Sequence, residues 1–258
     1  MEGFKMAKII TFANQKGGVG KTTTAHIVSI GIAKKGYKVL ACDLDPQANL
    51  TSVLGIDPDS DIVSIYDLFE GNCDISDAIV TTDAGVDLLV GSLMLSGADR
   101  KYSATGDEYK LKEALDSIKG NYDYIIIDTP PALGVMSLNG LATTDYLAVV
   151  MTPDYFSGKG LKQFQQTVET TKKYLSNPNL KINGLLLTRC DRTNLSSIIN
   201  DDMKEVAASL NSKIYNSKIR QGVAIRESQY LESSLFDMKD TAVLDDYNDF
   251  IDELLKEV

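Results

Sequence analysis

The 258-residue sequence has few cysteines and no long apolar run, features that mark disulfide-rich and membrane-spanning proteins. Its three cysteines, Cys42, Cys73 and Cys190, are far apart and form no CxxC pair. This argues against a disulfide framework or a thiolate metal site and favours a reducing cytoplasm. No apolar run approaches the roughly 18 residues needed to span a membrane, and the N-terminus lacks a signal-peptide pattern. We therefore expect a cytoplasmic protein.

The chain also lacks a linker rich in Pro, Gly or Ser, a low-complexity tract and an internal repeat. We therefore predict one α/β domain over residues 1–258, a length that doubly wound domains often reach. Residues 1–5 are interpreted as an extension before Met6.

Positive charge is scarce, because 26 Lys and Arg oppose 36 Asp and Glu, for a formal net charge of −10. This balance argues against constitutive binding of nucleic acid, since a phosphate polyanion is repelled at long range. The charge is uneven, however. Between residues 204 and 226 one acid, Glu205, accompanies five basic residues: Lys204, Lys213, Lys218, Arg220 and Arg226.

The strongest motif covers residues 14–23, Asn-Gln-Lys-Gly-Gly-Val-Gly-Lys-Thr-Thr. An apolar run at 9–13 predicts a buried strand before it, and residues 24–36 predict a helix after it. This is the context of a phosphate-binding loop, whose backbone N–H groups surround phosphate oxygens at a helix N-terminus. Lys21 is predicted to reach the β- and γ-phosphates of ATP, and the Thr22 hydroxyl to bind Mg²⁺.

Two residues depart from the general phosphate-loop pattern. Gln15 stands where that pattern has a glycine, and Lys16 adds a second lysine before the paired glycines. The alternative, a glycine-rich turn with solvated lysines, is disfavoured because the strand, the helix and Lys-Thr fall in register.

Two further apolar runs end in carboxylates. Residues 38–42 lead to Asp43 and Asp45, which alternation places on the same side of the strand end. Residues 122–127 lead to Asp128, as in a Walker B strand whose carboxylate orders magnesium. Ligands of α/β sheets lie outside the carboxyl ends of the strands, so we expect these acids beside the phosphate loop. The alternative for the first pair is a turn rich in Asp and Pro.

The rest of the chain predicts alternating strands and helices. Residues 46–85 are expected to form loops and short helices. Strands are predicted at 86–91, 145–152 and 182–188, with a short edge strand at 213–219, and helices at 108–118, 160–175, 196–210 and 241–258. Thr188 and Arg189 leave the 182–188 strand on the ligand side, where an adenine contact and an ordinary turn both remain open. The sole histidine, His26, is interpreted as a packed or exposed helix residue rather than a catalyst.

The C-terminal helix at 241–258 is predicted to dock an apolar face on the body. Its other face carries six acids against Lys256 alone: Asp245, Asp246, Asp249, Asp252, Glu253 and Glu257. An amphipathic membrane helix needs Lys and Arg to bind anionic lipid, so we reject a membrane anchor.

Three motifs together resemble the ParA/Soj group of partition ATPases, which belongs to the class with a deviant Walker A motif. They are Lys-Gly-Gly-Val-Gly-Lys-Thr-Thr at 16–23, Asp-Leu-Asp-Pro-Gln-Ala-Asn at 43–49 and Ile-Ile-Ile-Asp-Thr-Pro-Pro at 125–131. The resemblance covers essentially the full length. It implies the P-loop NTPase fold, a doubly wound, mostly parallel sheet with helices on both faces.

The resemblance also implies an ATP-dependent sandwich dimer that hydrolyses ATP with Mg²⁺, slowly unless a partner stimulates it. The implied catalytic residues are Lys16, which crosses to the other subunit's nucleotide, Lys21, which serves its own, and Asp45, which positions the attacking water. The implied magnesium residues are Thr22, Asp43 and Asp128. The nucleotide-binding residues are Lys16, Gly17, Gly18, Val19, Gly20, Lys21, Thr22, Thr23, Thr188 and Arg189.

In this family the ATP dimer binds DNA without sequence preference, and a DNA-bound ParB-type partner stimulates hydrolysis and release. The resemblance therefore implies a nucleoid-associated protein that acts in plasmid or chromosome segregation. We place the DNA contacts at Lys218, Arg220 and Arg226, with Arg189 as a weaker candidate; solvated surface charges are the alternative. Lys159 departs from the family, because many relatives carry an acid there.

Three alternatives use the same loop. A MinD-like positioning ATPase would act through protein partners without binding DNA, and the acidic C-terminal helix argues against its membrane-bound form. A metal-cluster carrier would need cysteines near the dimer axis. A metabolic ligase or kinase would phosphorylate a small molecule, and Lys16 would then have no evident role.

Overall fold

The computed structural model describes residues 6–153, 158–175, 177–178, 180–190, 197–230, 234–238 and 242–258. Within these residues an eight-stranded sheet has the strand order β3-β4-β2-β5-β1-β6-β7-β8. Neighbouring strands pair in parallel, except that β3 is antiparallel to β4. The strands are β1 (Lys8–Ala13), β2 (Val39–Asp43), β3 (Ile79–Thr81), β4 (Asp87–Leu89), β5 (Tyr124–Asp128), β6 (Tyr146–Met151), β7 (Ile182–Cys190) and β8 (Ile214–Arg220). The predicted doubly wound, mostly parallel sheet is confirmed.

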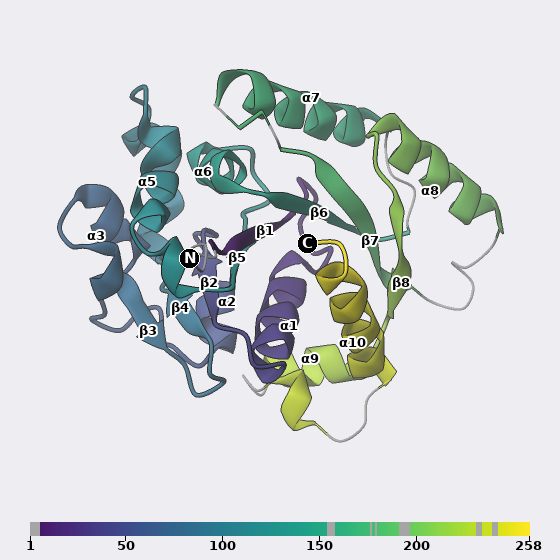
Figure 1. The fold of residues 1–258 in the computed structure, drawn as a ribbon, viewed down its shortest axis with the longest axis horizontal. Helices are drawn as coiled ribbons and strands as arrows, with labels where there is room; N and C mark the ends of the chain where they lie inside the picture. Colours follow the sequence, from purple (N-terminus) through teal and green to yellow (C-terminus); the bar gives the residue numbers. More distant parts are fainter. Residues whose placement is uncertain are drawn as a thin grey trace, which may run out of the picture.

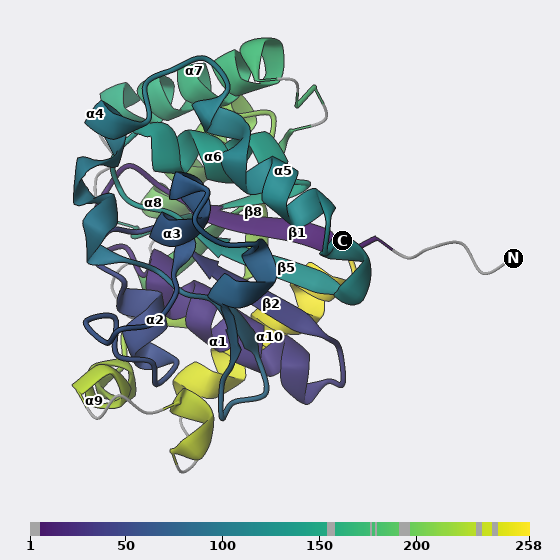
Figure 2. The same cartoon turned by 90° about the vertical axis from the view of Figure 1, so that its left-hand side faces the viewer.

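Helices cover both faces of this sheet (Figure 1). On one face lie α1 (Lys21–Lys34) and α10 (Ala242–Leu255). On the other lie α5 (Lys110–Asp116), α6 (Val135–Thr143), α7 (Gly158–Tyr174) and α8 (Ser197–Ser209), and the turned view separates the two layers (Figure 2). The other helices and 3₁₀ turns are α2 (Asn49–Val53), α3 (Ile65–Glu70), α4 (Ala98–Lys101), α9 (Val223–Tyr230), η1 (Ile75–Ala78), η2 (Leu93–Gly97), η3 (Asp107–Tyr109), η4 (Lys119–Asn121) and η5 (Leu235–Asp237).

The central strands are buried on both faces, which explains their unbroken apolar sequences. Ile125, Ile126 and Ile127 of β5 alternate between the two faces, and none is exposed to solvent. A parallel strand covered by helices on both sides reads as a continuous apolar run rather than an alternating one. The runs before Asp43 and Asp128 therefore predicted β2 and β5 correctly.

The stretch at 46–85, expected to hold only loops and short helices, also contains β3. This three-residue strand returns to β4 through a turn in which Thr82 N donates to Val86 O at 2.9 Å and Gly85 N donates to Thr82 O at 2.9 Å. A strand of three half-buried or exposed residues gives no periodic signal, so the omission has a simple physical cause.

The C-terminal helix α10 packs on β8 and α1. A Cβ at Gly31 of α1 would lie 2.3 Å from Ile251 Cδ1, so any larger residue there would force the Ile251 side chain to move. The acidic face of α10 is not simply solvated, because Asp246 and Glu253 accept hydrogen bonds from β8, and Asp252 pairs with Lys35 at 2.7 Å. Residue 241, the predicted helix start, lies outside the described residues, as do residues 1–5, residue 196 and the Lys159 side chain. No described helix has both the length and the apolar character needed to cross a bilayer.

Candidate functional site

The loop between β1 and α1 has the backbone that a phosphate-binding loop requires. Gly18 and Gly20 have φ values of 73° and 93°, in the left-handed region that glycine adopts without steric cost. Helix α1 begins directly afterwards at Lys21, and its N-cap residue Gly20 has no side chain to occupy the first-turn N–H groups. Such a helix start binds anions, because those N–H groups lack partners within the helix.

Two side chains hold this loop against neighbouring strands. Asn14 donates from Nδ2 to Val150 O of β6 at 2.7 Å, and its Oδ1 accepts from Lys16 N at 2.9 Å. The Thr188 hydroxyl donates to Val19 O at 2.7 Å. Thr188 was predicted to bind nucleotide, and its observed contact is with the loop itself. The motif at 14–23 includes Asn14 without assigning it a role, although a polar residue directly after an apolar run is visible in the sequence.

Asp43 and Asp128 lie side by side at the carboxyl ends of β2 and β5, where they are register partners. Both are fully buried, and Asp45 is 8% exposed. The oxygens of Asp43 are already engaged: Oδ2 accepts from Thr51 N at 2.8 Å and Thr51 Oγ1 at 2.9 Å, and Oδ1 accepts from Asp45 N at 3.2 Å. Burial raises the pKa of Asp43 to about 6, although the bonds from Thr51 oppose that rise.

Asp128 differs from Asp43 because neither of its oxygens has a hydrogen-bond partner among the described residues. Burial, followed by the nearby charge of Asp43, raises the pKa of Asp128 well above its usual value. The Thr22 side chain, which lies close to Asp128 without completing a hydrogen bond, and the charge of Lys21 oppose this rise. A buried carboxylate without partners is costly, so this arrangement fits a site for a cation or its bound water. No cluster of three or more His, Cys, Asp and Glu suited to a metal occurs in the described part of the chain. Thr22, Asp128, a nucleotide phosphate and water molecules would therefore have to share a magnesium ion.

The two lysines of the loop occupy different environments. Lys21 is 6% exposed. Burial lowers its pKa, and the charges of Asp128 and Asp45 oppose that shift. Lys16 is exposed and its Nζ lies 3.4 Å from Thr152 Oγ1. Asp45, on the turn after β2, accepts from Gln47 N at 3.0 Å. The fold thus gathers Lys21, Asp45 and Asp128 in one place and leaves Lys16 on the surface.

A cavity of about 230 Å³ opens beside the loop. The end of β7, the segment after β8 and α10 all contribute to it. Its lining consists of Val19, Gly20, Thr23, Thr188, Arg189, Ile219, Gln221, Gly222, Ile225, Arg226 and Tyr247. Arg189, with φ 53°, is one of the non-glycine residues in the left-handed region. The position of this cavity next to the phosphate loop suits the base and ribose of a nucleotide.

The four residues predicted to contact DNA do not share one environment. Arg189 and Arg226 line the cavity beside the phosphate loop. Arg220 is held by Asp246 through its guanidinium group, with Nε and Nη2 bonds of 2.7 and 2.6 Å. Lys218 lines a separate open groove between α8 and β8, together with Lys204 and Lys213.

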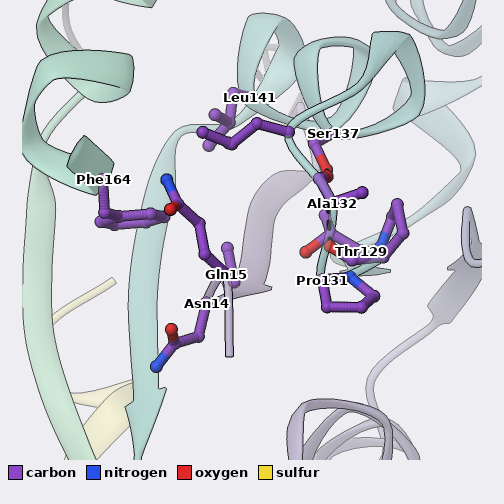
Figure 3. Close-up of a pocket in the computed structure, with 11 residues that line it drawn as sticks. Asn14, Gln15, Thr129, Pro131, Ala132, Ser137, Leu141 and Phe164 are labelled. Atoms are coloured by element: carbon purple, nitrogen blue, oxygen red, sulfur yellow. Dashed lines mark hydrogen bonds between the residues drawn. The ribbon is translucent and has the colours of Figure 1, made fainter. Parts of the chain in front are cut away.

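Gln15, one of the two departures from the general loop pattern, points away from the phosphate side of the loop. Figure 3 shows its side chain between Phe164 of α7 and Leu141 of α6, whereas Asn14 points in the opposite direction. Its Nε2 is buried and has no partner among the described residues. Gln15 and the turn that follows Asp128 line the same small pocket.

Comparison with known proteins places the chain in a family. The model of a family described as an AAA domain matches residues 7–182. The chain is 39% identical over 226 residues to the sporulation initiation inhibitor protein Soj of Bacillus subtilis, a match that covers 86% of this chain and 88% of that protein. It is 36% identical over 225 residues to the chromosome partitioning protein ParA of Caulobacter vibrioides, covering 86% and 83%.

Among solved structures, one of cobyrinic acid a,c-diamide synthase from Mycobacterium smegmatis, with bound ADP and magnesium, is 34% identical to this chain. It superposes with a TM-score of 0.83 and covers 97% of this chain and 95% of that one. Its ligands agree with the cofactors predicted here, ATP and Mg²⁺. The matches to Soj and ParA span most of both chains, and this chain belongs to the ParA/Soj family of partition ATPases.

Proposed function

We propose that this protein is a magnesium-dependent ATPase that segregates plasmid or chromosomal DNA, and that it acts as an ATP-bound dimer on DNA. The observation that carries the proposal is the unpartnered, fully buried carboxylate of Asp128 beside Lys21, at the start of α1. A carboxylate in this state favours a cation, and the glycine-rich loop favours the phosphates that would share it.

Each residue then has a distinct task in phosphoryl transfer, which depends mostly on positioning and charge neutralisation. Lys21 neutralises the β- and γ-phosphates from a buried position. Mg²⁺, held through Thr22 and Asp128, would neutralise further charge on the phosphates. Asp45, on the turn after β2, orients the attacking water. Asp43 supports this turn through the bond that Asp45 N donates to it.

Lys16 is proposed to act on the nucleotide of a second copy. Its exposed position is compatible with reaching outward, and Asn14 fixes its backbone N–H at 2.9 Å. A site divided between two subunits reaches full activity only after dimerisation, because the chemistry needs all its groups in place. Hydrolysis by the isolated protein is therefore expected to be slow.

DNA binding and a ParB-type partner are proposed from the family and from local charge. Lys204, Lys213 and Lys218 gather at the groove between α8 and β8, where Glu257 offsets the charge of Lys213. A dimer brings two copies of such a patch together, and attraction within the Debye length of about 8–10 Å can outweigh the acidic body. We place the first DNA contact at Lys218, whereas Arg220 has its charge largely offset by Asp246.

Three variants test this proposal against the parent. Lys21→Ala should lose ATP binding, and Lys16→Ala should bind ATP but fail to dimerise. Asp45→Ala should form the ATP-bound dimer without hydrolysing ATP. Binding of a fluorescent ATP analogue, sedimentation and phosphate release measure the three steps. Hydrolysis by Asp45→Ala at the parental rate would refute the role of Asp45 in positioning water.

The name of the Mycobacterium smegmatis protein supports a second candidate, an ATP-dependent biosynthetic synthase. The two functions differ in what accelerates ATP turnover. A partition ATPase responds to DNA with its bound partner protein, whereas a synthase responds to a small-molecule acceptor and yields a modified product. ATP turnover that rises only with a cobyrinic acid acceptor would replace the partition proposal.

A further inference from the structure

The C-terminal helix α10 is joined to strand β8 by two carboxylates. Glu253 accepts from Asn216 N at 2.8 Å and Ser217 N at 2.9 Å, and from the side chains of the same two residues. Asp246 accepts from Arg220 N at 2.9 Å and from the guanidinium group of the same residue. β8 is the last strand of the sheet order, so these carboxylates satisfy N–H groups that have no neighbouring strand.

The two attachments differ in what lies next to them. Asn216 and Ser217 are near the middle of β8, whereas Arg220 is its last residue. Residues on both sides of Arg220 line the cavity beside the phosphate loop: Ile219, Gln221 and Gly222. Gln221 N also donates to Cys190 O at the end of β7, at 2.9 Å. The Asp246 bond therefore lies where β8 becomes the cavity wall.

The same turn of α10 contacts the cavity at two further points. A Cβ built at Gly222 would lie 2.3 Å from Val243 Cγ2, so this part of the wall rests directly on the helix. Tyr247, which is 1% exposed, lines the cavity, and its hydroxyl is 3.3 Å from Thr24 Oγ1 of α1. Residues 243, 246 and 247 share one helix face, because they are three and four positions apart.

Asp246 is the more buried partner of this ion pair. Its side chain is 12% exposed, whereas that of Arg220 is 54% exposed. Arg220 does not line the cavity, so we assign its guanidinium group no direct role in holding a ligand there. A partly exposed ion pair contributes little to overall stability. Its three hydrogen bonds nevertheless fix both the backbone and the side chain of one residue.

We infer that Asp246 is a positioning residue for nucleotide binding: through Arg220 it holds the Gln221–Gly222 wall against the start of α1. The inference rests on the proposed function, since it assumes that a nucleotide base and ribose occupy the cavity. It assigns to α10 a role in the affinity of the protein for nucleotide. Because ATP and ADP share base and ribose, both should depend on Asp246 equally, and the transfer step should not.

The test compares Asp246→Asn with two matched controls in the full chain. Asp245→Asn removes the same charge one residue away, at an exposed position. Glu253→Gln weakens the other attachment of α10 to β8, away from the cavity. Dissociation constants for ATP and ADP, and kcat at saturating ATP, are measured for all three variants and the parent, alongside thermal melting.

For Asp246→Asn we expect affinities for ATP and ADP to fall by the same factor, roughly two- to tenfold, as for the loss of one or two hydrogen bonds. Its kcat at saturating ATP should stay within about twofold of the parent, as when only ground-state binding is lost. Arg220→Gln should reproduce this result, whereas Asp245→Asn and Glu253→Gln should bind nucleotide like the parent.

Two results would overturn the inference while the proposed function stands. One is parental nucleotide affinity in Asp246→Asn. The other is an equal loss of affinity in Glu253→Gln, which would indicate a general effect of loosening α10. If the parent binds neither ATP nor ADP, the proposed function fails, and the inference fails with it.

Discussion

Thr51 provides the sharpest test of how the carboxylate cluster is built. Its hydroxyl donates to Asp43 Oδ2 at 2.9 Å and accepts from Gly91 N at 2.9 Å, and both Thr51 and Asp43 are fully buried. Thr51→Val keeps the shape and the backbone bond to Asp43 but removes the hydroxyl. The variant loses a hydrogen bond to a charged group and leaves the Gly91 N–H without its acceptor.

Each of these losses costs about 1–3 kcal/mol, and since partial relaxation limits their sum, we expect a total of about 2–4 kcal/mol. Equilibrium unfolding in urea, without nucleotide, measures this loss, and Thr51→Ser serves as the control that retains the hydroxyl. ATP hydrolysis should fall as well, because Asp43 supports the turn that carries Asp45. A loss below about 1 kcal/mol in Thr51→Val, or an equal loss in Thr51→Ser, would refute the reasoning.

Two further predictions concern stability away from the cluster. Burial lowers the pKa of His26 to about 4, so between pH 6.5 and 4 the unfolded chain binds a proton more readily than the folded protein does. The free energy of unfolding should therefore drop by about 3 kcal/mol as pH falls through this window. His26→Gln should remove that drop. The reasoning fails if NMR titration of this sole histidine gives a midpoint near 6.5. Asp99 Oδ1 accepts from Val135 N at 2.7 Å at the start of α6, so Asp99→Ala should cost about 1 kcal/mol in urea unfolding, as for a lost helix cap. Unchanged stability in Asp99→Ala would contradict this.

The sheet and the phosphate loop could be predicted because their signals are local. A strand buried on both faces needs an apolar run, and the loop needs glycine where φ is positive, as at Gly18 and Gly20. Both requirements are visible in consecutive residues. The strand β3 has neither signal, since it is short and only partly buried, and it forms because the turn at 82–86 returns the chain to β4.

Other features depend on residues that are distant in sequence. Asp43 and Asp128 both end apolar strands, and only the packing of Thr51 engages one and leaves the other without partners. The acidic face of α10 reads as a solvated surface, yet Asp246 binds Arg220, which lies 26 residues earlier. No local pattern predicts such a pairing, because the fold determines which charges meet.

DNA binding by the ATP-bound dimer tests the central claim most directly. Asp45→Ala, which should retain ATP, is titrated with random-sequence duplex DNA in the presence of ATP, of ADP or of no nucleotide, over a series of salt concentrations. The account predicts tight binding with ATP alone that weakens steeply as salt rises, because phosphate contacts release counterions. A dimer that forms with ATP but binds no DNA at any salt concentration would contradict the claim.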